Sequence, residues 1–156
     1  MAKTMHWQVV PGVVHIVVHT DESPTDPEWD AYLADVLKHA HDIKGVLVYT
    51  VKAGPTASQR ARSNEAFKAS GSTIQTVIMT ASRLVQGMVT ALSWAVGSKI
   101  RAFSTVDFAG ATDCLGLDEA QKAETRVQLR MLARSAGLEI DAFADESGWF
   151  RRKKND

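Results

Sequence analysis

The chain has 156 residues, of which 45% are hydrophobic and 23% are charged, a composition typical of a single soluble globular domain. Its 18 lysines and arginines balance 18 aspartates and glutamates, so the formal net charge is zero. Because bulk binding to nucleic acid or to an anionic membrane requires a basic surface, this balance argues against both classes of partner.

The cysteine content and the hydropathy pattern favour a cytoplasmic protein. The single cysteine, Cys114, excludes an internal disulfide and fits a reducing compartment. The N-terminal residues contain no apolar run long enough for a signal peptide. The most apolar stretch, residues 84–96, is too short and too polar to span a bilayer, so we expect no membrane insertion.

Short apolar runs rich in β-branched residues indicate the strands. The first two runs flank a Pro11-Gly12 turn and predict a β-hairpin, in which the second strand has one fully apolar face and one face that also carries His15 and His19. Strands are predicted at residues 6–10, 13–19, 46–51, 73–79 and 99–103.

Helices are predicted where apolar residues recur at steps of three and four. Asp26 is expected to cap the first helix, with Pro27 at its first position, and Ser82 and Asp107 are expected to cap later ones. Helices are predicted at residues 28–42, 57–70, 83–96, 108–115 and 119–136. The expected inner faces are Ala57, Ala61, Asn64 and Phe67 in the second helix, and Ala120, Ala123, Val127, Met131 and Leu138 in and just after the last.

The order of these elements predicts an α/β fold. Repeated β-α units that follow a hairpin give a mixed sheet, antiparallel at the hairpin and parallel beyond it. We expect one domain over residues 1–138 and a C-terminal extension over residues 139–156. That extension carries Trp149 and a basic run ending at Lys154. The basic run is expected to be either a solvated terminus or a weak tether to an acidic partner.

Two short motifs suggest a family. GPTASQRA, at residues 54–61, follows the third predicted strand, and ALSW, at residues 91–94, precedes the strand KIRAF. With the element order, they make the chain resemble the STAS or SpoIIAA-like domains, and more closely the bacterial single-domain proteins labelled STAS/SEC14-like. The resemblance covers residues 7–138 and implies a SpoIIAA-like α/β fold.

The same resemblance implies a candidate phosphosite. In regulated STAS domains the third strand leads to an Asp-Ser-Ser/Thr-Gly motif whose first serine is phosphorylated. The alignment places Ala57 at the aspartate, Ser58 at the phosphorylated serine, Gln59 at the second hydroxyl and Arg60 at the glycine. Only Ser58 keeps the family residue, and a plain helix-capping role is its alternative.

Two predicted helix starts could form an anion site. If the third and fourth strands are neighbours, the helices that follow them begin at the same edge of the sheet, where free N–H groups and the helix dipole favour anions. Arginines near both starts would add donors suited to phosphate or carboxylate. Ordinary caps and solvated arginines are the alternative. The candidate binding residues, for an anion or a protein partner, are Thr56, Ser58, Arg60, Arg62, Ser82 and Arg83.

The sequence favours a non-enzymatic signalling or scaffold module that binds a protein through residues 54–62 and 82–88. The five histidines lack metal-ligand spacing and are expected to be solvated or to face a partner, and neither a Gly-x-Ser-x-Gly elbow nor a glycine-rich phosphate loop occurs. We therefore expect no metal or cofactor. The alternatives are a SEC14-like domain that binds a lipid or another small amphiphile, and an enzyme of another kind. A homodimer through an uncovered edge or face of the sheet is also possible.

Overall fold

The computed structural model describes residues 3–71, 74–87 and 99–140. Within these ranges, five strands form one sheet in chain order, with the first pair antiparallel and the other pairs parallel. The mixed sheet predicted from the element order is therefore confirmed. The strands are β1 (Met5–Val10), β2 (Val14–His19), β3 (Gly45–Thr50), β4 (Gln75–Thr80) and β5 (Ile100–Phe103).

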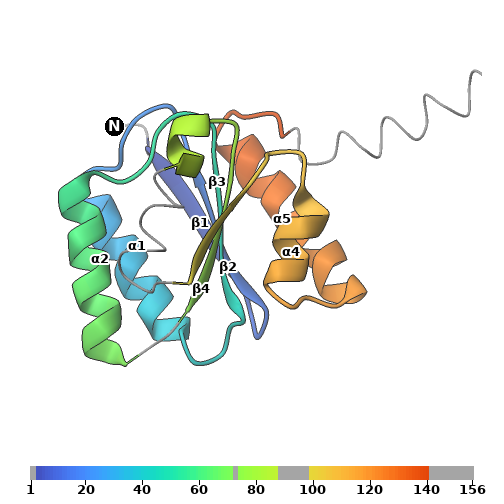
Figure 1. The fold of residues 1–156 in the computed structure, drawn as a ribbon, viewed down its shortest axis with the longest axis horizontal. Helices are drawn as coiled ribbons and strands as arrows, with labels where there is room; N and C mark the ends of the chain where they lie inside the picture. The colour runs from blue at the N-terminus through green and yellow to red at the C-terminus, as the bar shows by residue number, and fades with distance from the viewer. Residues whose placement is uncertain (1–2, 72–73, 88–98, 141–156) are drawn as a thin grey trace, which may run out of the picture.

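Helices cover both faces of the sheet (Figure 1). On one face lie α1 and α2, whereas α5 packs on β1 and β2 of the other face and α4 packs there on β4 and β5. Residues 83–87 are also helical, and the remainder of the helix predicted at 83–96 lies outside the described residues. The helices are α1 (Asp26–His39), α2 (Ala57–Ser70), α4 (Phe108–Cys114) and α5 (Glu119–Ser135).

The helix starts follow local capping chemistry, with one correction. Asp107 caps α4 as predicted, and its carboxylate accepts a hydrogen bond from the Gly110 N–H at 2.9 Å. Helix α1 is capped by Thr25 and not by Asp26, because Thr25 holds the extended backbone and its hydroxyl accepts from the Glu28 N–H. Asp26 is consequently the first residue of the helix, where the helix dipole stabilises its negative charge.

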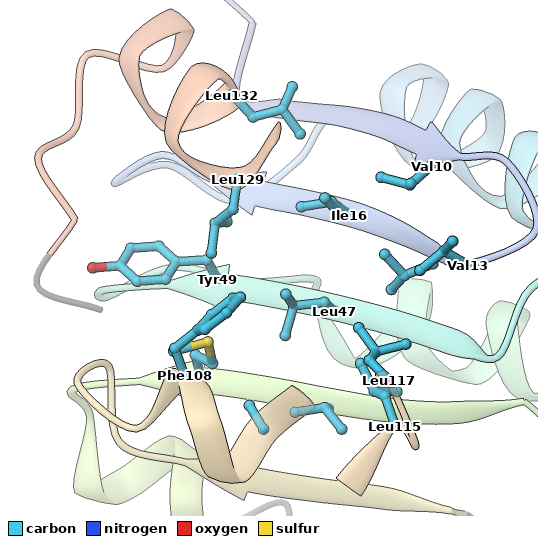
Figure 2. Close-up of a cluster of buried hydrophobic side chains, with 14 of the residues drawn as sticks. Val10, Val13, Ile16, Leu47, Tyr49, Phe108, Leu115, Leu117, Leu129 and Leu132 are labelled. Carbon is cyan, nitrogen blue, oxygen red and sulfur yellow. The ribbon is translucent and has the colours of Figure 1, made fainter. Parts of the chain in front are cut away.

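Among the described residues, two apolar clusters fill the space between the sheet and its helices. The larger cluster joins β1, β2, β3 and β4 to α4 and α5 (Figure 2), and the smaller one joins the opposite face to α1. Strand β2 contributes to both, with Ile16 and Val18 in the larger cluster and Val17 in the smaller one. The alternation predicted for this strand is therefore correct, although its histidines are buried.

The predicted inner face of α5 is wrong. Residues Thr125, Leu129 and Leu132 are buried, whereas Val127 and Met131 are each 55% exposed. The buried residues and the predicted inner residues both recur with helical spacing. The buried set is favoured because its two leucines bury more apolar area than the alanines that accompany Val127 and Met131. Ala120 and Ala123 are likewise exposed, and Leu138 alone of the predicted set packs against the core.

The predicted inner face of α2 is also mostly wrong. Ala57, Ala61 and Asn64 are exposed, and Phe67 alone of that line packs against the smaller cluster. The buried residues of this helix are Gln59 and Ser63. These polar side chains lie inside because they find hydrogen-bond partners on α1 and the loop before it, as described next.

Candidate functional site

The candidate site lies where β3 and β4 end. The two strands are parallel neighbours in register, with Thr50 paired with Thr80, as the site prediction required. Both α2 and the helical residues 83–87 begin beyond this edge of the sheet (Figure 1). Thr50 donates a hydrogen bond to the Ala53 carbonyl, so the turn that leads to α2 is fastened to the strand end.

The start of α2 forms a capping box. The Thr56 hydroxyl accepts from the Gln59 N–H at 3.2 Å, and the Gln59 side-chain oxygen accepts from the Thr56 N–H at 2.9 Å. Within the described part of the chain, the N–H groups of Ala57 and Ser58 have no hydrogen-bond partner. Ser58 is exposed, and the first turn carries no acidic residue that would repel an anion.

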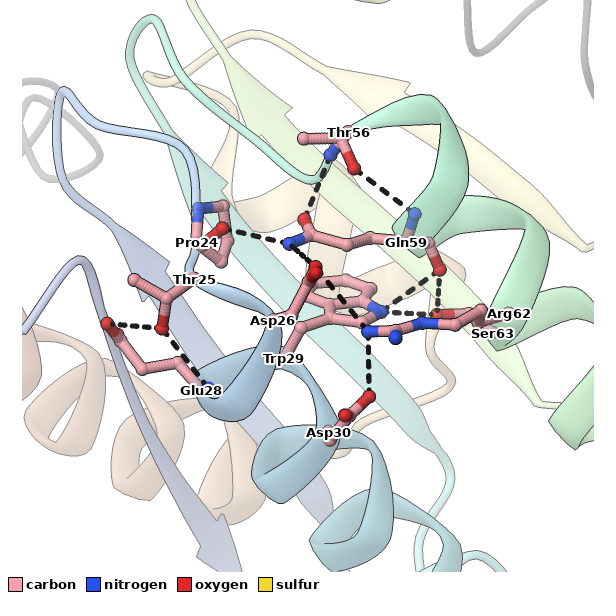
Figure 3. Close-up of polar contacts among 10 residues, drawn as sticks. All are labelled: Pro24, Thr25, Asp26, Glu28, Trp29, Asp30, Thr56, Gln59, Arg62 and Ser63. Carbon is pink, nitrogen blue, oxygen red and sulfur yellow. Dashed lines mark hydrogen bonds and ion pairs between the residues drawn. The ribbon is translucent and has the colours of Figure 1, made fainter.

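Gln59 also joins the start of α2 to the start of α1 (Figure 3). Its side-chain amide donates to the Pro24 carbonyl at 2.8 Å and to the Asp26 carboxylate at 3.0 Å, and the residue is 1% exposed. The residue that aligns with the second hydroxyl of the STAS motif is therefore a buried structural link.

Trp29 provides a second link between the two helices. Its indole N–H donates to the Gln59 carbonyl at 3.0 Å and to the Ser63 hydroxyl at 2.9 Å (Figure 3). This contact is not among the features predicted from the sequence. The signal that could have revealed it is the spacing of Gln59 and Ser63, which places two polar side chains on one side of α2.

The three candidate arginines have different surroundings. Arg62 lies beside two carboxylates of α1, at 2.8 Å from Asp30 and 3.6 Å from Asp26. Arg60 donates to the Pro55 carbonyl at 2.8 Å, so its guanidinium is held over the turn before α2. Arg83 is exposed at the start of the next helical segment. An anion that used Arg62 would have to compete with the acidic residues of α1.

Ser82 behaves as a helix cap. Its hydroxyl accepts from the Val85 N–H at 3.3 Å, and its carbonyl accepts from the Gln86 N–H at 3.1 Å. The Gln86 side chain donates to the Thr80 carbonyl, which fastens this segment to the end of β4. Next to Ser82 and Arg83, the Leu84 side chain is 75% exposed and adds an apolar contact surface to this edge.

Two histidines of β2 are buried under α1, contrary to the expectation that they are solvated or face a partner. Burial lowers the pKa of His19 to about 4, and burial also lowers the pKa of His15 although the Asp35 carboxylate acts in the opposite direction. His15 Nε2 lies 2.8 Å from Asp35, which is 3.7 Å from His39. Among the described residues, no three His, Cys, Asp or Glu side chains are placed to hold a metal ion.

The fold over about two thirds of this chain is similar to that of an uncharacterised protein of the DUF3478 family from Shewanella loihica PV-4, whose crystal structure is described as having a SpoIIAA-like fold. The TM-score is 0.50, and the match covers 65% of this chain and 83% of that chain at 12% sequence identity. The fold is SpoIIAA-like. At this identity the similarity establishes the SpoIIAA-like fold alone. No family model matches the chain, and no curated protein matches it.

Several predicted features lie outside the described residues. These are the ALSW motif at residues 91–94 and most of the C-terminal extension with its basic run. Within the described residues of this SpoIIAA-like fold, no helix is both long and apolar enough to cross a membrane.

Proposed function

We propose that the chain is a non-enzymatic signalling or scaffold module that binds a protein partner at the edge where α2 and residues 83–87 begin. We place this module in residues 1–138, with residues 139–156 as an extension. The observation that supports the proposal is the exposed first turn of α2, which offers Ser58 and two N–H groups without partners in the described structure. Exposed Leu84 provides an apolar contact beside them.

Ser58 is the position at which we propose that a phosphate or another anion regulates binding. A phosphate there would add about two negative charges at neutral pH. At the second position of a helix, each such charge is favoured by about 0.3–1 kcal/mol through the helix dipole. Because the capping box and Gln59 already fix the start of α2, phosphorylation would change the charge of the surface more than its shape.

The surroundings of the two serines support binding over catalysis. A serine nucleophile needs a base within hydrogen-bond reach. In the described part of the chain, neither the Ser58 nor the Ser82 hydroxyl contacts a histidine or a carboxylate. The apolar clusters on both faces of the sheet are packed against helices, which favours a protein partner over an enclosed amphiphile.

The test combines native modification with a charge-placement comparison. Mass spectrometry of the protein from its own cells should find phosphate on Ser58. Ser58→Glu should change the affinity for the identified partner at least about fivefold, whereas Ala61→Glu, which places the same charge on the exposed side of α2 one turn later, should not. An unmodified Ser58, together with equal affinities for all three proteins, would overturn the proposal.

Inorganic phosphate provides a simpler probe of the same surface. Titration of the unmodified protein should shift the amide resonances of Ala57 and Ser58, because their N–H groups have no protein acceptor in the described structure. The amide of Gln59 serves as the control, since its N–H already donates to Thr56. Shifts of equal size at all three amides would contradict a localised site.

A further inference from the structure

We infer that α5 carries a self-complementary surface through which two copies of this chain associate as an antiparallel helix pair. The surface consists of Ala123, Glu124, Val127, Met131 and Arg134, and we call it the α5 outer face. All five residues are exposed. They occupy the side of α5 opposite the buried Leu129 and Leu132, so α5 is apolar on two sides.

The apolar content of the α5 outer face is unusual for a solvated helix. Val127 and Met131 are each 55% exposed and lie one turn apart, so their side chains form a continuous strip with Ala123. In the described residues only Leu84 and Val106 are other large apolar side chains with comparable exposure, and neither lies on α5. Adjacent exposed apolar side chains with polar residues at their rim are typical of a protein contact.

The charges of this face identify the occupant as a second copy. Glu124 lies toward the start of the helix and Arg134 toward its end, and neither makes an ion pair within the described structure. The point midway between Val127 and Met131 is also midway between Glu124 and Arg134. A two-fold axis through that point places Val127 opposite Met131 of the second copy.

The same axis brings Glu124 of each copy to the level of Arg134 of the other. A parallel arrangement would instead align Glu124 with Glu124 and Arg134 with Arg134, and would be disfavoured by like charges. In the antiparallel pair, one two-fold axis therefore places apolar side chains against apolar side chains and Glu124 against Arg134 at both ends. This is the self-complementary contact that an isologous interface requires.

Pairing through α5 would not cover the proposed binding site at the start of α2. Helix α5 covers β1 and β2 on the face of the sheet opposite α1 and α2 (Figure 1). Dimerisation and binding at the start of α2 are consequently independent, and loss of one does not require loss of the other. A single helix of 17 residues buries less area than a typical stable dimer, so we expect a weak dimer in the micromolar range.

The test is the concentration dependence of the mass of the full chain, measured by sedimentation equilibrium. Val127→Asp should weaken dimerisation about tenfold or more, because it places a charge in the centre of the strip. Val106→Asp, an exposed apolar position away from α5, should leave the dissociation constant unchanged. Both variants should melt close to the parent, since both side chains are exposed.

A charge exchange tests the antiparallel pairing itself. Glu124→Arg or Arg134→Glu alone should weaken the dimer about fivefold, and the double variant should restore it. A chain that stays monomeric at all concentrations, or a dimer that is unaffected by Val127→Asp, would overturn the inference. A double variant no better than the single variants would overturn the antiparallel register.

Discussion

Replacement of Gln59 tests whether the start of α2 is held by the buried link described above. The side chain of Gln59 makes three hydrogen bonds, to the Thr56 N–H, the Pro24 carbonyl and the Asp26 carboxylate, and the residue is 1% exposed. Gln59→Ala removes all three hydrogen bonds, and the alanine side chain offers no donor or acceptor to the groups that Gln59 contacted. Each lost hydrogen bond costs about 1 kcal/mol, and more where a buried group stays unsatisfied.

The expected loss of stability is therefore about 3 kcal/mol. For a domain of this size, 1 kcal/mol changes Tm by about 2–4 °C, so Tm should fall by about 6–12 °C. Equilibrium urea unfolding measures the free energy directly, and amide hydrogen exchange should show faster exchange at the Thr56 N–H, whose acceptor has been removed.

Two matched variants separate the link from general effects of substitution in α2. Ser58→Ala, one residue earlier and exposed, should change the free energy of unfolding by less than about 0.5 kcal/mol. Gln59→Glu keeps the oxygen that accepts from the Thr56 N–H, but places a carboxylate against the Pro24 carbonyl and Asp26, so it should cost at least as much as Gln59→Ala at pH 7. A loss below about 1 kcal/mol for Gln59→Ala would show that the buried hydrogen bonds of Gln59 do not hold the start of α2.

Two further predictions concern a buried histidine and a glycine. Unfolded His19 takes up a proton near its ordinary pKa of 6.5 but folded His19 only near a pKa of about 4, so the unfolded state binds more protons between these values. The free energy of unfolding should therefore fall by up to about 3 kcal/mol as the pH decreases from 6.5 to 4. Urea unfolding should show a weaker pH dependence for His19→Gln. The control is His41→Gln, at an exposed position, which should keep the pH dependence of the parent. Gly45→Ala should cost about 2 kcal/mol, because the added Cβ would meet the Gln75 carbonyl oxygen and the Leu115 side chain. Gly54→Ala, which meets nothing within 4 Å, should unfold at the same urea concentration as the parent, and equal losses at the two glycines would contradict the packing argument.

Local sequence patterns were sufficient to predict the order and direction of the strands in the sheet. Turn residues at Pro11-Gly12 and β-branched runs located the strands, and the α2 bounds were predicted as the structure has them. The parallel direction of β3 and β4 followed from the β-α units, because each crossover returns the chain in the same direction, whereas their pairing as neighbours is a finding of the structure. These features depend on the conformational preferences of residues close together in the sequence and on the order of the elements along the chain. Both can be seen without knowing the tertiary structure.

The inward-facing sides of α2 and α5, in contrast, depend on long-range packing and were not predictable from either helix alone. Helix α5 has two apolar sides, and the sheet selects the one with Leu129 and Leu132 because it buries more area. In α2 the buried side is polar, since Gln59 and Ser63 bond to groups of α1 and the loop before it. Arg62 is likewise directed to α1 by Asp30. Each of these choices depends on partners far away in the sequence, and a periodic pattern within one helix contains no information about them.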